Sequence, residues 1–254
     1  MRYCAQLEKV LKLNNSHPIL AKEGWGIIGV IFFVTLLVWW LIGGFVSFVF
    51  WLIFIFVVQF FRDPKRAVSQ TPHAVVSGVD GRICKVQKTV NPYTGKEEIL
   101  ISTFMNVFNV HSCYTPIGGK TEEIHYIPGS FVNADLDKAS EQNERNAVIV
   151  KSDEGPVITF VQIAGLVARR IVCHLHVGDE VSRSERYGFI RFGSRLDVYV
   201  PLDSEVLVFV GQKVRATDTV LALLNRNEER AEKSEVVEVA EEVKAEATAE
   251  EAAK

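Results

Sequence analysis

The stretch GFIRFGSRLDVYVP, from Gly188 to Pro201, sets two apolar runs on either side of Gly193–Ser194. The second run, LDVYVP, alternates apolar and polar residues, which predicts a β-strand. A serine directly after a glycine can attack the carbonyl of the peptide bond that joins them, and Gly193 presents that carbonyl without a side chain. An ordinary Gly–Ser turn between strands fits the same dipeptide. Gly193–Ser194 is therefore a candidate self-processing bond, and the surrounding segments have to decide between the two interpretations.

Short β-like runs of alternating apolar residues continue on both sides of this stretch, from Val75 to about Val210, with Gly, Pro, Asn and Asp between them. A weak internal repeat lies within them. VGDEVSRSERYGFI, from Val177, resembles VGQKVRATDTVLAL, which begins 33 residues later at Val210. A G-D-x-V turn before an apolar strand is typical of the hammerhead in lipoyl- and biotinyl-type domains. We therefore expect a mainly β, barrel-sandwich domain over residues 62–225, although two similar hairpins would give the same spacing.

An apolar run from Gly24 to Phe61 contains no charged residue, which indicates a membrane anchor over residues 24–61. One straight helix of that length would measure about 57 Å, whereas the hydrocarbon core is about 30 Å thick. Two helices turning near Gly43–Gly44 fit better, and a single tilted span or a monotopic dip into one leaflet stays open. Basic residues flank both ends, so we expect residues 1–23 and the β-domain on the cytoplasmic side of the cell (inner) membrane.

Composition limits the remaining possibilities. The segment from residue 226 to 254 is acidic and of low complexity: from Glu228 it holds ten Glu against four Lys or Arg, and it is expected to be a solvated tail. The cysteines are scattered without a CxxC pair and the histidines lack a metal-ligand spacing, so no metal site is expected. The small net charge of −3 gives no support for nucleic-acid binding.

Four ordered blocks resemble the short-type (type A) prokaryotic phosphatidylserine decarboxylases. They are SGVDGRI (77–83), FMNVFNVHSCYTP (104–116), IAGLVARRIVC (163–173) and FGSRLDVYVP (192–201). The resemblance runs from about Phe60 to about Leu221. It favours the self-processing interpretation of Gly193–Ser194 over the ordinary turn.

The resemblance implies a pyruvoyl-dependent lyase made from a precursor. In that family the serine, here Ser194, attacks the carbonyl of the preceding glycine, here Gly193, and the chain is cut into residues 1–193 and 194–254, which stay associated as a heterodimer or a higher oligomer. The serine becomes a pyruvoyl group. This protein-derived cofactor makes a Schiff base with phosphatidylserine, CO2 leaves and phosphatidylethanolamine is released. The expected partners are thus the lipid substrate and the bilayer.

Other site residues follow from the same blocks. His111 is the candidate base that activates Ser194, because a neutral imidazole suits proton transfer near pH 7, and Asp80 would orient the imidazole as in a Ser-His-Asp triad. A structural histidine and an Asp–Gly hairpin turn are the plainer alternatives. Arg169 and Arg170 are candidates for binding the substrate carboxylate or phosphate, and adjacent strand residues point to opposite faces, so one of them would face the site.

The chain departs from the family pattern at a few positions. Long-type relatives carry a second histidine where this chain has Tyr114, which leaves open whether His111 serves both cleavage and decarboxylation. Gly78 replaces a frequent proline, and Arg195 follows the serine as in short-type members. A membrane-tethered barrel-sandwich adaptor without catalysis is the alternative function. It would share the anchor and the repeat, but it would not need a Gly–Ser bond to cut.

Overall fold

The computed structural model describes residues 19–130, 142–165, 170–191 and 193–225. The predictions for Arg169, for most of residues 1–23 and for the acidic tail lie outside the described residues. The elements run in the order η1 (Lys22–Gly24), α2 (Trp25–Leu41), α3 (Gly44–Phe60), β1 (Ala74–Val76), β2 (Gly81–Val90), β3 (Glu97–Met105), β4 (Ser112–Tyr114), β5 (Gly119–Ile127), β6 (Arg145–Ser152), β7 (Val157–Ala164), β8 (Ile171–Cys173), β9 (Glu180–Val181), β10 (Arg186–Ile190), β11 (Ser194–Pro201), β12 (Glu205–Val206), β13 (Lys213–Val214) and β14 (Val220–Leu223).

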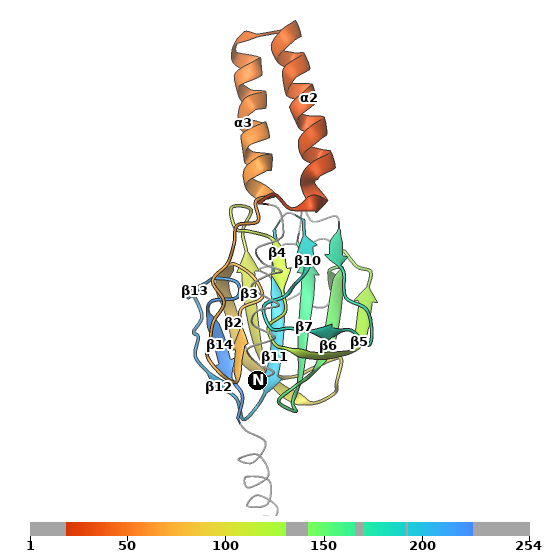
Figure 1. Ribbon diagram of the computed structural model, residues 1–254, viewed down its shortest axis with the longest axis vertical. Coiled ribbons are helices and arrows are strands. Elements are labelled where there is room, and N and C mark those ends of the chain that lie inside the picture. The colour runs from red at the N-terminus through yellow and green to blue at the C-terminus, as the bar shows by residue number, and fades with distance from the viewer. Residues whose placement is uncertain (1–18, 131–141, 166–169, 192, 226–254) are drawn as a thin grey trace, which may run out of the picture.

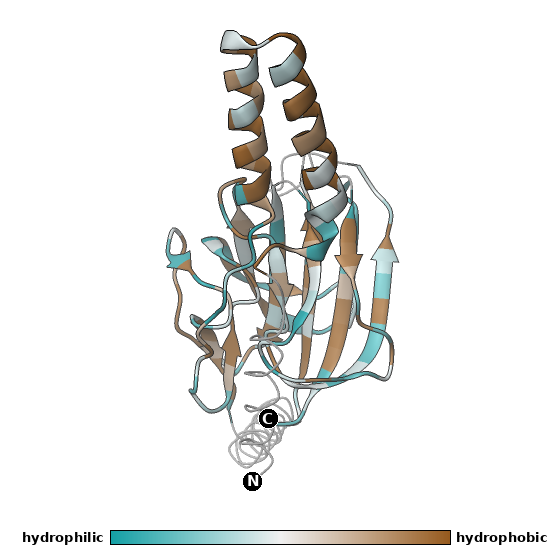
Figure 2. Ribbon diagram, turned by 45° about the horizontal axis from the view of Figure 1, so that its top comes forward, coloured by the Kyte–Doolittle hydropathy of each residue, from teal (hydrophilic) through white to brown (hydrophobic). Residues whose placement is uncertain are grey.

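The apolar run forms a helical hairpin that projects from one end of a β-domain (Figure 1). Helices α2 and α3 are joined at Ile42 and Gly43, and the backbone of Gly43 and of Gly44 has φ values of 62° and 60°, a conformation that a side chain disfavours. The hairpin is apolar along both helices (Figure 2). Lys22–Leu41 is long and apolar enough to cross a membrane, and Gly44–Phe60 is a shorter apolar helix.

The β-domain is built on an antiparallel sheet with the strand order β13-β2-β3-β11-β7-β6-β5-β9. Strand β11 lies in the middle, paired along its length with β3 on one side and with β7 on the other. Two small sheets, β4-β10-β8 and β1-β14-β12, complete the domain. The mainly β fold with an α-helical N-terminal segment, expected from the sequence, is confirmed.

The internal repeat corresponds to two interlocked units of the same topology. The strand order of the large sheet is symmetric about its centre. Counted from the two edges, β13 corresponds to β9, β2 to β5, β3 to β6 and β11 to β7. Equivalent hydrogen bonds close the two edges. The amide of Gly178 donates to Thr121 O at 2.8 Å, and the amide of Gly211 donates to Ile83 O at 2.7 Å. The VGDEV and VGQKV turns therefore occupy equivalent places in the two units.

The core of the β-domain lies on the face of the large sheet that carries the side chains of Leu196, Val198 and Val200 from β11. A second cluster joins the hairpin to the domain: Phe60 and Phe61 at the end of α3 pack against Phe189 of β10. The Phe61 and Phe189 rings are stacked with centroids 5.6 Å apart. The hairpin foot, residues 56–62 at the end of α3, thus packs directly on the folded domain.

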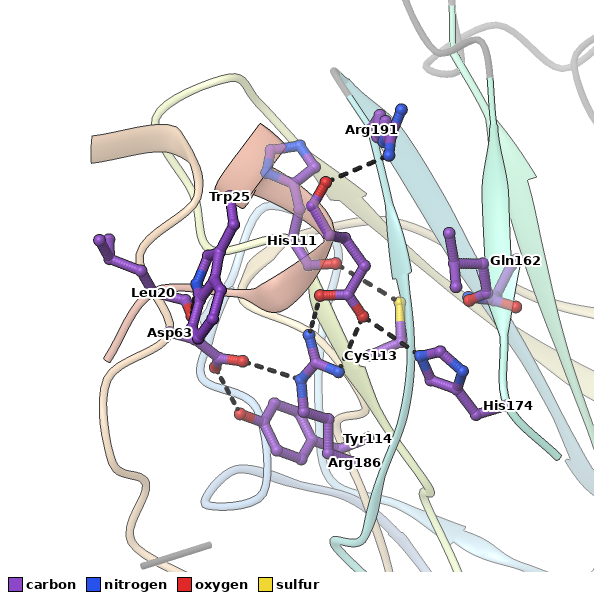
Figure 3. Close-up of polar contacts among 12 residues, drawn as sticks. Leu20, Trp25, Asp63, His111, Cys113, Tyr114, Gln162, His174, Arg186 and Arg191 are labelled. Carbon is purple, nitrogen blue, oxygen red and sulfur yellow. Dashed lines mark hydrogen bonds and ion pairs between the residues drawn. The ribbon is translucent and has the colours of Figure 1, made fainter. Parts of the chain in front are cut away.

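A buried polar network reinforces this junction (Figure 3). The guanidinium of Arg186 on β10 binds Glu23 through its two terminal nitrogens at 3.1 and 3.0 Å, and its Nε binds Asp63 Oδ2 at 2.8 Å. Arg191 donates to the Glu23 carbonyl at 3.1 Å. Charged groups that are paired and hydrogen-bonded in this way fix the geometry of the elements that carry them. The hairpin therefore enters the domain at a defined angle beside β10.

Candidate active site

The Gly193–Ser194 bond lies at the start of the central strand β11, at the end of the sheet nearest the hairpin (Figure 1). Gly193 has a φ of 65°, and a Cβ added there would meet no atom within 4 Å, so the backbone conformation rather than space favours glycine. Ser194 is fully buried, and its Oγ donates to the sulfur of Met105 on β3 at 3.9 Å. A weak thioether acceptor leaves the hydroxyl without a strong competing partner.

His111 lies beside this bond. The amide of Gly193 donates to His111 Nε2 at 3.3 Å, and His111 Nδ1 is 3.0 Å from the carbonyl oxygen of Asn109. A carbonyl oxygen only accepts, so Nδ1 carries the proton and Nε2 presents its lone pair to the scissile segment. The structure thus brings the predicted base to the residue that precedes the predicted nucleophile.

The environment of His111 keeps its imidazole neutral. The side chain is fully buried, and the Phe60 ring at the end of α3 lies 4.4 Å away between centroids. Burial lowers the pKa of His111 to about 4, and the positive charge of Arg62 acts in the same direction, against the carbonyl of Asn109 and the charge of Asp80. Desolvation disfavours the charged form of a histidine. At neutral pH His111 is therefore a free base.

Asp80 does not hold the imidazole through a hydrogen bond. Its carboxylate accepts two bonds from Arg66, at 2.7 and 2.8 Å, and a third from the amide of Ala216 at 2.9 Å. The position that Asp80 would occupy in a triad is taken by the Asn109 carbonyl. Asp80 still acts on His111 through its charge, which raises the pKa of the imidazole. Its predicted role in the reaction stays a prediction.

Tyr114, at the position of the second histidine in long-type relatives, faces the hairpin junction. Its hydroxyl donates to Asp63 Oδ1 at 2.9 Å (Figure 3). Burial raises the pKa of Tyr114, and so does the neighbouring Asp63 carboxylate. The hydroxyl therefore stays protonated and serves as a donor in the network that docks the hairpin.

Of the two arginines predicted to bind substrate, Arg169 lies outside the described residues. Arg170 is exposed at the same end of the sheet, and its carbonyl accepts from the amide of Arg191 at 3.4 Å. This contact places Arg170 beside the chain segment that leads into Gly193. Its role in substrate binding stays a prediction.

Comparison with known proteins identifies the family. Residues 53–222 match the family model described as phosphatidylserine decarboxylase. Curated proteins named phosphatidylserine decarboxylase proenzyme are similar over most of the chain. The relative from Polynucleobacter asymbioticus is 57% identical over 82% of this chain and 96% of its own length, and the relative from Cupriavidus metallidurans is 52% identical over 84% and 99%. That from Ralstonia nicotianae is 53% identical over 84% and 100%. The chain belongs to the phosphatidylserine decarboxylase family.

As a phosphatidylserine decarboxylase family member the chain is a lyase of phospholipid biosynthesis, and the adaptor alternative is set aside. Its relatives are named as proenzymes, a word for a precursor that is processed. Within the described ranges, no group of three or more His, Cys, Asp or Glu could hold a metal ion.

Sequence reasoning missed part of the site. Met105 and Asn109 lie in the block that contains His111, but a block does not reveal which backbone carbonyl receives an imidazole proton. Phe60 and Glu23 lie at the two ends of the apolar run, where the pattern indicates only a membrane segment. The available signal was the charged residue at each end of the apolar run. Glu23 precedes the run and Arg62 follows it, and both contact the β-domain.

Proposed function

We propose that this protein cuts itself between Gly193 and Ser194 and then decarboxylates phosphatidylserine to phosphatidylethanolamine at the surface of the cell (inner) membrane, with the β-domain on the cytoplasmic side. The observation that carries the proposal is the contact between the Gly193 amide and Nε2 of a neutral, buried His111 at the head of β11. A serine nucleophile needs a base close to its hydroxyl, and the contact supports this role because His111 binds the residue next to Ser194.

The cleavage proceeds in balanced steps. Ser194 Oγ attacks the Gly193 carbonyl carbon while its proton passes to His111, and the peptide C–N bond breaks as that proton is returned to the nitrogen of Ser194. The product is an ester between the two residues. Loss of the Ser194 α-proton expels the Gly193 carboxylate and leaves dehydroalanine. Water then replaces the nitrogen, which departs as ammonia, and residue 194 becomes a pyruvoyl group.

The residues around position 194 fit such a group. The position is buried at the head of β11, its side chain contacts the thioether of Met105, and the imidazole of His111 contacts the preceding residue, Gly193. A pyruvoyl carbonyl supplies the electron sink that decarboxylation of an amino acid needs. We propose that His111 also handles the substrate proton, since Tyr114 is committed to Asp63.

Two charged groups complete the proposed site. Asp80 acts through its charge, favouring the imidazolium that forms when His111 accepts a proton. Arg170, and Arg169 beside it in the chain, are proposed to receive the carboxylate or phosphate of the lipid, because guanidinium groups bind both in a bidentate manner. The hairpin would hold this end of the β-domain against the headgroup layer, where the substrate lies.

Intact mass of the purified protein tests the proposal. Two chains, 1–193 and 194–254, are expected, the second lighter by one ammonia than a peptide that begins with serine. Ser194→Ala should remain one uncut chain and release no CO2 from phosphatidylserine vesicles, whereas Ser204→Ala, a buried serine beyond the end of β11, should process like the parent. A parent protein that stays at full mass yet decarboxylates the lipid would contradict the pyruvoyl route.

A further inference from the structure

The asparagine-rich turn before His111 links the hairpin to the imidazole. The amide of Asn106 donates to Asn109 Oδ1 at 3.0 Å, and the amide of Phe108 donates to Asn106 Oδ1 at 2.9 Å. These side-chain bonds close residues 106–109 into a compact turn. Its last carbonyl, Asn109 O, is the one that takes the proton of His111 Nδ1. Whatever holds this turn therefore also sets the position and tautomer of His111.

The foot of the hairpin holds the turn from the other side. Arg62 donates through Nη2 to Phe108 O at 2.8 Å and through Nη1 to Gln59 O at 2.8 Å, and Gln59 Nε2 donates to the same Phe108 carbonyl at 3.2 Å. The Phe56 and Phe108 rings meet edge to face, with centroids 6.2 Å apart. A continuous path of contacts thus runs from α3 through the turn to His111 and on to the amide of Gly193.

The internal repeat supplies a comparison within the same chain. His73 precedes β1 as His111 precedes β4, and its carbonyl accepts from Leu224 at 2.9 Å as that of His111 accepts from Ile190 at 3.2 Å. Gly155, with a φ of 104°, stands two residues before β7, and Pro156 follows it. The internal repeat therefore carries a second histidine and glycine at the equivalent positions, with Pro156 where the reactive site has Ser194.

The two histidines differ in what surrounds them. The His73 side chain is 41% exposed, and its Nδ1 pairs with Glu154 at 2.9 Å. His111 is fully buried, bonded to a backbone carbonyl and aimed at Gly193. The hairpin foot packs on the domain at His111, where the Phe60 ring lies against the imidazole. The same backbone position thus becomes a buried base where the hairpin docks on it.

We infer that Arg62 and Gln59 are positioning residues for His111, and that the hairpin is thereby part of the self-processing machinery as well as an anchor. The inference rests on the proposed self-cleavage. Arg62 and Gln59 touch neither Ser194 nor the scissile bond in the contacts described; they act through the 106–109 turn and its bond to Nδ1.

Timed cleavage tests this inference. The parent, Arg62→Met, Arg62→Lys and Gln59→Leu are synthesised cell-free with phosphatidylethanolamine/phosphatidylglycerol vesicles, translation is stopped, and the uncut fraction is followed by gel and intact mass. Lys88→Met, which removes an exposed cation from β2, is the matched control. We expect Arg62→Met to slow cleavage on the order of tenfold, a part of the 10²–10⁴ that a positioned base contributes. Gln59→Leu should slow it less, and Arg62→Lys should restore part of the rate.

The pH dependence of cleavage separates positioning from a loss of folding. The charged groups that act on His111 are Arg62, beyond the end of α3, and Asp80, between β1 and β2; Phe60 and Phe189, from α3 and β10, bring no charge. Removing the Arg62 charge should move the acid limb of the cleavage rate to higher pH, and Arg62→Lys should move it back. Vesicle flotation of each variant checks that the anchor is still inserted.

The outcomes are distinct. If the parent cleaves and the Arg62 and Gln59 variants cleave at its rate with the same acid limb, the inference is wrong and the proposed function stands. If the parent itself never cleaves, the proposed function fails and the inference falls with it. If Arg62→Met floats with the vesicles but cleaves slowly with a shifted acid limb, the hairpin foot positions the base.

Discussion

His111 shows how one buried side chain can be prepared for proton transfer without a carboxylate partner. Its Nδ1 proton is fixed on a backbone carbonyl, its ring is covered by Phe60, and its Nε2 lone pair faces the Gly193 amide. Burial under Phe60 favours the neutral form and outweighs the bond to the Asn109 carbonyl, which on its own raises the pKa of the imidazole. The cost is that the protein must keep an uncharged histidine at a pH where the unfolded chain would protonate it.

The stability of the uncut precursor should therefore depend on pH through His111. Its pKa is about 4 in the folded protein against 6.5 for an unperturbed histidine, so between these values the unfolded chain binds more protons and folding weakens as the pH falls. Over the whole range between the two pKa values, this linkage lowers the free energy of unfolding by about 3 kcal/mol. Urea unfolding of Ser194→Ala in detergent, from pH 7 to pH 4, should show a steeper loss than Ser194→Ala/His111→Gln.

The same substitution at the equivalent histidine provides the control. On the Ser194→Ala background, His73→Gln removes a half-exposed histidine from the equivalent backbone position and is the matched control. Equal slopes for the His111→Gln and His73→Gln proteins would show that burial of His111 does not govern acid stability.

Individual site residues were predictable to different degrees. Gly193, Ser194 and His111 were named from the sequence because each sits in a motif whose chemistry requires that residue type. The hydrogen-bond partner of His111 was not predicted, because every residue has a backbone carbonyl and the sequence does not show which one lies beside the imidazole. Asp80 was predicted to orient the imidazole, but its carboxylate accepts hydrogen bonds from Arg66. That pairing depends on how the chain folds back between the two residues, which no local sequence pattern shows.

Strand β11 carries a buried ion pair directly after Ser194. Arg195 and Asp197 lie two residues apart and so share the face opposite to Leu196, and both are fully buried. Arg195 Nη2 donates to Asp197 Oδ2 at 2.9 Å, and its Nε lies 2.8 Å from Oδ1. A buried pair of this kind contributes little net stability compared with apolar residues, whereas one partner alone is costly.

Substitutions in this pair should consequently be non-additive. On the Ser194→Ala background, Arg195→Met or Asp197→Leu alone should lower the free energy of unfolding by about 3–5 kcal/mol, because each removes one charge of a buried ion pair and keeps the other. The double variant should regain most of that loss. Urea unfolding of the three proteins measures this, and a double variant as unstable as the sum of the singles would argue against a compensated pair.

Individual strands and helices followed closely from the sequence. Alternation of apolar residues predicted the strands, and the turn at Gly43–Gly44 predicted the hairpin that α2 and α3 form. The repeat at Val177 and Val210 pointed to equivalent turns, which the structure has at the two edges of the large sheet. Strand pairing was not predictable, because β11 pairs with β3 and β7, which are remote in the chain.

The protein as a whole consists of an apolar hairpin packed on one end of a β-domain (Figure 2). Both helices of the hairpin carry large exposed apolar side chains, among them Phe33 with 70% and Ile53 with 45% of its surface exposed. Exposed apolar surface of this kind is typical of a site that contacts a membrane or another protein, and the length and composition of Lys22–Leu41 favour the membrane. The acidic tail lies outside the described residues, so its prediction stays untested.

Charges in the middle of the hairpin should detach the protein from lipid. An aspartate at the centre of a membrane helix costs roughly 3 kcal/mol, so Phe33→Asp/Ile53→Asp should reduce binding to vesicles at limiting lipid by on the order of a hundredfold or more. Val90→Asp, at an exposed apolar position on β2, should bind like the parent. Flotation with phosphatidylglycerol-containing vesicles measures the bound fraction; unchanged flotation of the double variant would mean that the hairpin does not enter the bilayer.

The place of β11 between β3 and β7 has a consequence for the protein after the proposed cut. The bond breaks at the first residue of the strand, yet β11, β13 and β14 all pair with strands on the other side of the break. Before the cut, folding is a unimolecular process. Afterwards, denaturation would release two polypeptides whose refolding is second order and depends on their concentration, as for an obligate dimer. Self-processing would thus make the order of events matter: the native structure must form from the single chain, and an unfolded mature molecule has lost the connection that assembled it.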